Sequence, residues 1–269
     1  MTLKPTTGRR RRLLVAMDCN AESLAGLRRA AVLAGELRVE LAGLFLEDIN
    51  LLRMSELPGH EISLASGTGK STSRVEMERQ MRRSANAAKE EVARLAQALS
   101  LSWTFEVRRA SMDQALREAA KTEELVCSVL ASPFFPTLKS RPARQNRGAP
   151  TNSILAIFEN GERGGRVLEL AARAARVHGL PLEVLVPARD AASGAKAVAK
   201  AGEVLGKTAG KAVSVTTRRL PLSEAAIVGA LTSARGQLLF LDAGGKIASI
   251  KSLATLRSAI NCDVLLVSS

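Results

Sequence analysis

Two short apolar runs, Leu13-Leu-Val-Ala-Met-Asp18 and Ile154-Leu-Ala-Ile-Phe-Glu159, decide the fold of this 269-residue chain. Each run ends in an acidic residue, and each is followed by a polar turn and an Ala- and Leu-rich segment with helical spacing. A second apolar run follows each helical segment, at Val39–Leu46 and at Leu182–Val186. The chain therefore contains an internal repeat, whose second copy begins 141 positions after the first.

The later parts of the two copies also correspond. Trp103–Arg109 parallels Val213–Arg219 at an offset of 110 positions, and a segment that begins with a helix-capping Ser follows each. A fourth apolar run closes each series, at Leu125–Leu130 and at Gln237–Leu241. The offset falls from 141 to 110, which places 31 extra residues in the first copy, mainly in an inserted loop at Asn50–Ser73. Strands that are almost wholly apolar and alternate with helices predict a parallel sheet covered on both faces.

We therefore predict two tandem, doubly wound α/β domains of the flavodoxin-like or adenine nucleotide α-hydrolase-like type. The first covers residues 11–132 and the second residues 153–269, with a basic, Pro-containing linker at 133–152. Only the second copy continues into a helix near Ile250–Ile260 and a fifth strand, Asp263–Val267. The first domain is predicted to lack its last helix and strand.

A first strand that ends in Asp, a variable loop after the second strand, and Cys-Asp-Val-Leu-Leu-Val at residues 262–267 resemble the universal stress protein family. The resemblance covers both halves and implies a non-catalytic, cytoplasmic stress-response or regulatory protein that acts by binding. Nucleotide-binding members of that family carry Gly-x-x-Gly, nine residues and Gly-Ser/Thr after the fourth strand. Those glycines allow backbone N–H groups to approach the phosphates.

The chain departs from that glycine motif in both copies. After Gly244, the two later glycine positions hold Ile247 and Arg257, and the first copy has no glycine after its fourth strand until Gly148. We therefore expect no cofactor and no tight ATP binding, with an adenine nucleotide held through a degenerate motif as the alternative. The residues that the resemblance leaves as candidates for a cofactor site are Asp18, Glu159, Gly244 and Gly245.

Other residues that could carry chemistry have ordinary structural interpretations. Gly67-Thr-Gly-Lys-Ser-Thr72 ends like a P-loop but lacks its first glycine and the preceding strand, which favours a loop at a helix start. His60 and His178 have no partners in the sequence pattern, so we assign no metal site and no catalytic residue.

The three cysteines are far apart and form no CxxC pair, which is typical of reduced thiols rather than of a disulfide framework or a zinc site. They are Cys19, Cys127 and Cys262. A reactive thiol at Cys19 is the alternative, because a helix N-terminus lowers a thiol pKa.

The composition describes a globular chain, with 46% hydrophobic residues, and its charge is strongly basic, with a net charge of +13. The basic clusters Arg9–Arg12, predicted to be a tail before the first strand, and Lys139–Arg147 could make non-specific contacts with anions. A nucleic-acid-associated protein is therefore a second alternative. One Trp, six Phe and no Tyr leave few side chains on which bases could stack.

The fifth strand of the second copy also bears on assembly. Asp263–Val267 is apolar, and an exposed edge there would promote aggregation. Either the first half covers it within one chain, or the same strand of a second chain pairs with it. Because the first copy offers no matching strand, we predict a homodimer through this strand. No apolar window is long enough to span a membrane.

Overall fold

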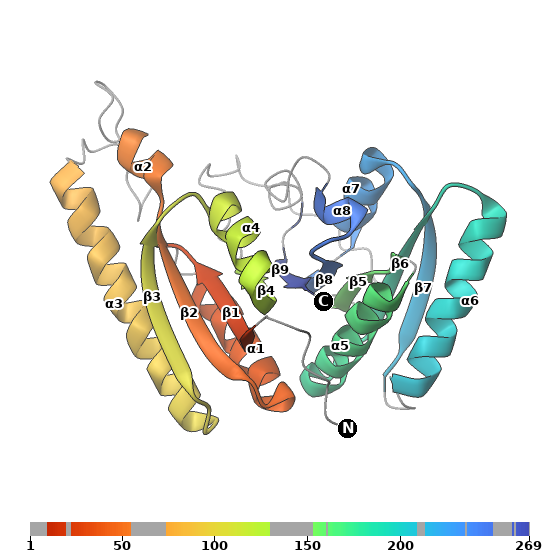
Figure 1. Cartoon of the computed structure of the whole chain (residues 1–269), viewed down its shortest axis with the longest axis horizontal. Coiled ribbons are helices and arrows are strands. Elements are labelled where there is room, and N and C mark those ends of the chain that lie inside the picture. The colour runs from red at the N-terminus through yellow and green to blue at the C-terminus, as the bar shows by residue number, and fades with distance from the viewer. Residues whose placement is uncertain are drawn as a thin grey trace, which may run out of the picture.

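The computed structural model describes residues 10–19, 23–54, 74–129, 153–159, 161–208, 213–234, 236–249, 260 and 262–268. Its centre is one mostly parallel sheet of nine strands, in the order β3-β2-β1-β4-β9-β8-β5-β6-β7 (Figure 1). The first half supplies β1 (Arg10–Met17), α1 (Ser23–Leu37), β2 (Glu40–Glu47), α2 (Ile49–Met54), α3 (Arg74–Ala98), β3 (Trp103–Arg109), α4 (Met112–Thr122) and β4 (Glu123–Ser128). The second half supplies β5 (Ser153–Ile157), α5 (Glu162–His178), β6 (Leu182–Ala188), α6 (Ala191–Thr208), β7 (Val215–Pro221), α7 (Glu224–Ser233), β8 (Gly236–Asp242), α8 (Lys246–Ser249) and β9 (Asp263–Val267).

Both faces of the sheet are covered by helices, which explains why the central strands are largely apolar, whereas the edge strands β3 and β7 are polar and mostly exposed. Leu13, Val15 and Met17 point to the core under α1, α3, α5 and α6, whereas Leu14 and Ala16 point to the core under α4, α7 and α8. Burial of one such large side chain stabilises the fold by about 1.5–3 kcal/mol. The predicted α/β class and its two-sided cover are confirmed.

The two halves repeat one strand order. β3-β2-β1-β4 corresponds to β7-β6-β5-β8, and within each half all neighbouring strands are parallel. The predicted helix starts are also present, since Ser111 and Ser223 accept hydrogen bonds from the N–H groups of Gln114 and Ala226.

Two details of the prediction need qualification. The insertion after β2 begins with the short helix α2, whose Leu52 packs on α3, and its remainder lies outside the described residues. The predicted linker at 133–152 and the helix near Ile250–Ile260, apart from Ile260, also lie outside them.

The C-terminal strand β9 lies in the middle of the sheet. It pairs antiparallel with β4 of the first half and parallel with β8 of its own half. Both of its edges are therefore occupied within one chain, so β9 leaves no free edge for the predicted homodimer through Asp263–Val267. The first half has no fifth strand among its described residues, and β9 takes the place beside β4.

The antiparallel β4–β9 pair reverses the direction of the second half. Ligands of parallel α/β sheets bind at the carboxyl ends of the strands. These carboxyl ends point in opposite directions in the two halves. Asp18 follows β1 and Glu159 follows β5, so the two predicted acids lie at opposite ends of the strands.

The expected basic tail is partly built into the sheet. β1 begins at Arg10, and the guanidinium of Arg12 binds the Glu123 carboxylate through two hydrogen bonds of 2.7 and 2.8 Å. Arg12 is therefore a packed and paired residue and not part of a mobile tail, which corrects the prediction. Arg9 and the Lys139–Arg147 cluster lie outside the described residues. No helix in the described part of the chain is long and apolar enough to cross a membrane.

Candidate functional site

Glu159 binds the loop after β8, which is where the resemblance would place a phosphate in the second half. Its carboxylate accepts hydrogen bonds from the backbone N–H groups of Lys246, at 2.7 Å, and Ile247, at 2.8 Å. These N–H groups belong to the first turn of α8, directly after the Gly244-Gly245 pair. A carboxylate of the chain itself thus lies where the resemblance would place a bound anion.

The two glycines make this arrangement sterically feasible. A Cβ on Gly245 would lie 2.5 Å from Glu159 Oε2, so any side chain there would push the carboxylate away. A Cβ on Gly244 would lie 2.6 Å from Arg163 Nη1, and the Gly244 N–H donates to Asp242 Oδ1 at 2.9 Å. The structure therefore brings three of the four candidate residues together, in a loop whose N–H groups bind carboxylates of the chain.

Asp18, the fourth candidate, lies at the opposite ends of the strands, in acidic surroundings. It is half-buried after β1, and Asp48 is close enough for its charge to act, like that of Asp18, on the neighbouring Cys19 thiol. At the ends of β2 and β3, Glu47 binds the guanidinium of Arg109 at 2.9 Å. Among the described residues, this end of the sheet therefore presents several carboxylates, which would oppose a phosphate.

The described cysteines are poorly suited to nucleophilic chemistry. Burial raises the pKa of Cys19 to about 11 and that of Cys262 to about 12, and it raises the pKa of Cys127 as well. Burial and the nearby charge of Arg29 lower the pKa of His178. The reactive-thiol alternative for Cys19 finds no support in these surroundings. His60 and the P-loop-like segment lie outside the described residues.

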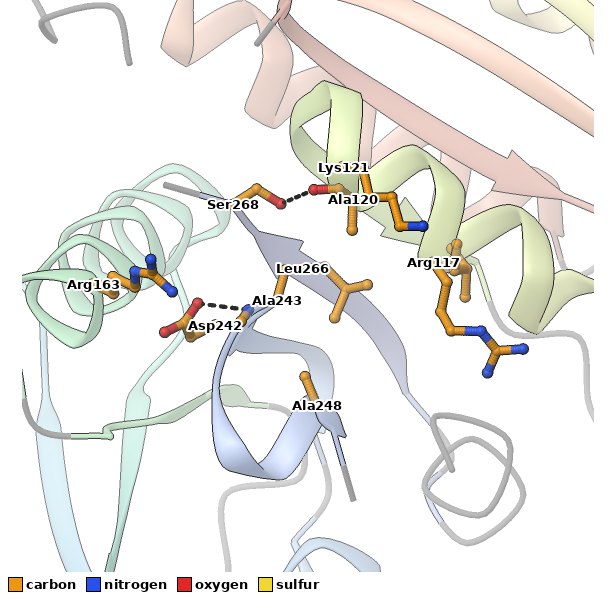
Figure 2. Close-up of a pocket in the computed structure, with 11 residues that line it drawn as sticks. Arg117, Ala120, Lys121, Arg163, Asp242, Ala243, Ala248, Leu266 and Ser268 are labelled. Carbon is orange, nitrogen blue, oxygen red and sulfur yellow. Dashed lines mark hydrogen bonds between the residues drawn. The ribbon is translucent and has the colours of Figure 1, made fainter. Parts of the chain in front are cut away.

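A pocket of about 300 Å³ lies where the two halves meet, and we call it the junction pocket (Figure 2). Its apolar lining comes from α4, α8 and the strand ends, and its polar lining includes three cationic side chains and one carboxylate. Among its lining residues are Leu116, Arg117, Ala120, Lys121, Arg163, Asp242, Ala243, Gly244, Ala248, Leu266 and Ser268. The sequence analysis predicted only Gly244 of this set. The available signal was the basic pair Arg117 and Lys121, spaced four residues apart on a helix.

A second hollow, of about 360 Å³, lies between α4 and strands β1 to β3. Its charges are matched by one another: Arg12 binds Glu123, and Arg108 binds Glu106 and Glu118. It therefore offers less to a charged ligand than the junction pocket does. No cluster of three or more potential metal-ligating side chains occurs among the residues that the structure describes.

Comparison with known proteins identifies the fold. No protein-family model and no curated protein sequence matches this chain. The structure is similar to a universal stress protein from Archaeoglobus fulgidus DSM 4304, with a TM-score of 0.50 and 12% identity over 97% of each chain. The cytoplasmic domain of a prokaryotic cation chloride cotransporter matches with a TM-score of 0.42 and 12% identity over 96% of each chain. A protein of the universal stress protein family from Burkholderia pseudomallei matches with a TM-score of 0.25 and 15% identity, over 80% of this chain and 98% of that one. Only the first TM-score reaches 0.5, and it indicates a fold of the universal stress protein type.

Proposed function

We propose that this chain is a tandem universal stress protein that acts in the cytoplasm by binding, without catalysis and without tight ATP binding. The repeated strand order of the two halves and the similarity to the Archaeoglobus protein support the tandem assignment. The raised thiol pKa values support a role without catalysis, since a thiol is nucleophilic as its thiolate.

The observation that carries the proposal is the contact between Glu159 and the start of α8. Two backbone N–H groups of the loop already donate to a carboxylate, and such charge-assisted hydrogen bonds are stronger than neutral ones. A nucleotide phosphate would have to displace Glu159 and then lie beside its negative charge. ATP binding in this half therefore requires Glu159 to leave the two N–H groups, and the free energy of that movement weakens the binding.

Thermal unfolding with millimolar magnesium ATP tests the proposal. A ligand at 100 times its Kd adds about 2.7 kcal/mol, which for a chain of this size is a rise in Tm of roughly 5–10 °C. We expect a rise of less than about 1 °C for the wild type on the same scale. A rise of several degrees would support the alternative, a nucleotide-binding protein with a degenerate motif.

The variant Glu159→Ala examines the contact itself. It frees the two N–H groups and removes the charge, so we expect ATP to stabilise this variant more than the wild type. Glu162→Ala is the matched control, because Glu162 is an exposed acid three residues further along the chain, at the start of α5, whereas the two N–H groups donate to Glu159. Equal ATP responses of the two variants would remove the role given to Glu159.

An absorbance spectrum of the purified protein addresses the nucleic-acid alternative. With one Trp and no Tyr, the chain absorbs weakly at 280 nm, so co-purified nucleotide or nucleic acid would dominate near 260 nm. We expect no such excess absorbance. Mass analysis of the denatured supernatant would distinguish nucleotide from nucleic acid if one appeared.

A further inference from the structure

We propose that the junction pocket binds a small organic anion, in which a phosphate or carboxylate group is joined to a short apolar body. This site is separate from the nucleotide question, because it lies between the halves and does not use the N–H groups that Glu159 holds. The first half provides one wall through α4, and the second half provides the opposite wall through α5, β8 and α8 (Figure 2).

The pocket follows from the way in which β9 joins the halves. Leu266 and Ser268 lie at the end of β9, between α4 on one side and the loop after β8 on the other. The Ser268 hydroxyl donates to the Ala120 carbonyl at 2.9 Å, which fixes α4 against the end of β9. A volume of about 300 Å³ is at the small end of ligand pockets and suits a small metabolite.

The charge of the pocket is unbalanced toward positive. Arg117 and Lys121 project from successive turns of α4, and Arg163 lies on the opposite wall beside Asp242, the one carboxylate of the lining (Figure 2). No carboxylate of the described residues lies within 4.0 Å of the guanidinium groups of Arg117 or Arg163.

Two arginines of β3 differ in this respect. Arg109 binds Glu47, and Arg108 binds Glu106, each at 2.9 Å. Carboxylates thus lie beside these two cations, whereas the described residues place none within 4.0 Å of the two guanidinium groups of the pocket. An external anion is the partner that we propose for them.

The floor of the pocket indicates that the ligand has an apolar part. Five apolar side chains line it, and three of them, Ala120, Ala243 and Ala248, are partly exposed. The five are Leu116, Ala120, Ala243, Ala248 and Leu266. An inorganic anion would leave this surface uncovered, whereas an organic anion would bury it and gain hydrophobic free energy.

Gly244 controls the position of the cation on the second wall. Because a Cβ there would lie 2.6 Å from Arg163 Nη1, an alanine would displace the end of this flexible side chain without a backbone clash. Gly244→Ala is therefore a mild change that alters the geometry of the pocket while leaving every charge in place.

Titration calorimetry of the full chain with three probes tests the proposal. Phenyl phosphate carries both an anion and an apolar ring. Inorganic phosphate supplies the anion alone, and benzyl alcohol supplies the ring without the anion. We expect phenyl phosphate to bind at least about tenfold more tightly than either of the others. The proposal is overturned if phenyl phosphate does not bind, or if inorganic phosphate or benzyl alcohol binds equally well.

Paired variants locate the site. Arg117→Ala combined with Lys121→Ala should raise the Kd for phenyl phosphate by about tenfold or more. The matched control is Arg79→Ala combined with Arg83→Ala, which removes two exposed cations with the same spacing from α3. A similar loss in both double variants would mean general attraction by the basic surface and would overturn the proposal. If the α4 variant does not fold, Arg163→Ala and Gly244→Ala decide, and unchanged affinity in both overturns it.

Discussion

The guanidinium of Arg29 on α1 binds the carboxylate of Asp263 at the start of β9, across 234 positions of sequence. The contacts measure 3.0 Å from Nε and 2.5 Å from Nη2, and the Asp263 side chain is only 3% exposed. Helix α1 of the first half thereby holds β9, the strand of the second half that pairs with β4 of the first half. A buried carboxylate of this kind depends on its cation, because an unpaired buried charge is very unfavourable.

A second ion pair crosses the same junction in the opposite direction. Arg166 on α5 of the second half binds Glu124 on β4 of the first half, and both side chains are largely buried. The antiparallel β4–β9 pair therefore carries one cross-half ion pair from each of its strands. The two ion pairs thus accompany the backbone pairing that joins the halves into one sheet.

Removing the charge of Arg29 should destabilise the protein far more than removing that of its neighbour. Arg29→Met leaves Asp263 buried without its partner and should lower the free energy of unfolding by about 2–4 kcal/mol. Arg28→Met is the control, because Arg28 is 62% exposed and its pair with Glu91 should contribute less than about 1 kcal/mol. Urea unfolding of both variants measures the difference, and equal losses would contradict the role of the buried pair.

Two glycines of α1 should respond oppositely to alanine. A Cβ on Gly26 would lie 2.3 Å from Val129 Cγ1 and 2.8 Å from Asp263 Oδ2, so Gly26→Ala should cost about 1–3 kcal/mol through overpacking. A Cβ on Gly35 would meet nothing within 4 Å, so Gly35→Ala should stabilise the helix by up to about 1 kcal/mol. Thermal unfolding checks the sign of each change, and stabilisation by Gly26→Ala would show that β9 does not pack closely on α1.

The sequence predicted the strands and helices well because their signals are local. The apolar runs Leu13–Asp18 and Ile154–Glu159 indicate buried strands, and the serines at 111 and 223 indicate helix starts that the structure confirms. The central position of β9 was missed, since strand pairing depends on contacts far apart in the chain. Nothing in Asp263–Val267 itself indicates whether its second neighbour belongs to the same chain or to another.

The candidate site shows the same limit. The family resemblance pointed to Glu159, Gly244 and Gly245, and the structure brings these residues into one loop. That the carboxylate would occupy the N–H groups of Lys246 and Ile247 depends on side-chain geometry that a motif does not contain. The junction pocket was missed because its walls come from both halves, which only the reversed β4–β9 pairing brings together.

Glu91 on α3 should contribute to the acid sensitivity of the fold. Hydrogen bonds from Arg94 and then from Arg28 lower the pKa of Glu91 to about 2, below its value of about 4.3 in an unfolded chain. The stabilisation is therefore present above pH 4.3 or so and is lost as the pH falls toward 2. Because both arginines are exposed, we expect about 1 kcal/mol. Glu91→Gln should flatten the stability profile between about pH 5 and 2, and an unchanged slope would contradict it.

The three thiols should react slowly in the native protein. Burial raises the pKa of Cys19 to about 11 and that of Cys262 to about 12, so little thiolate is present at pH 8. Ellman's reagent should label the native chain far more slowly than the urea-unfolded chain, in which all three thiols are accessible. Rapid labelling of one thiol in the native chain, mapped to Cys19 by peptide mass analysis, would revive the interpretation of Cys19 as a reactive residue.

Leu265→Pro distinguishes a strand paired within one chain from a strand that joins two chains. Leu265 is fully buried and pairs with Cys127 on β4 and with Phe240 on β8. Proline removes a backbone donor and cannot be accommodated in a central strand, so the change should cost about 3 kcal/mol or more and disrupt the fold of both halves together. Circular dichroism and light scattering should show loss of cooperative unfolding, not conversion of a dimer to a stable monomer. A folded monomeric variant from a dimeric wild type, with an unchanged Tm, would instead mean that β9 pairs between chains.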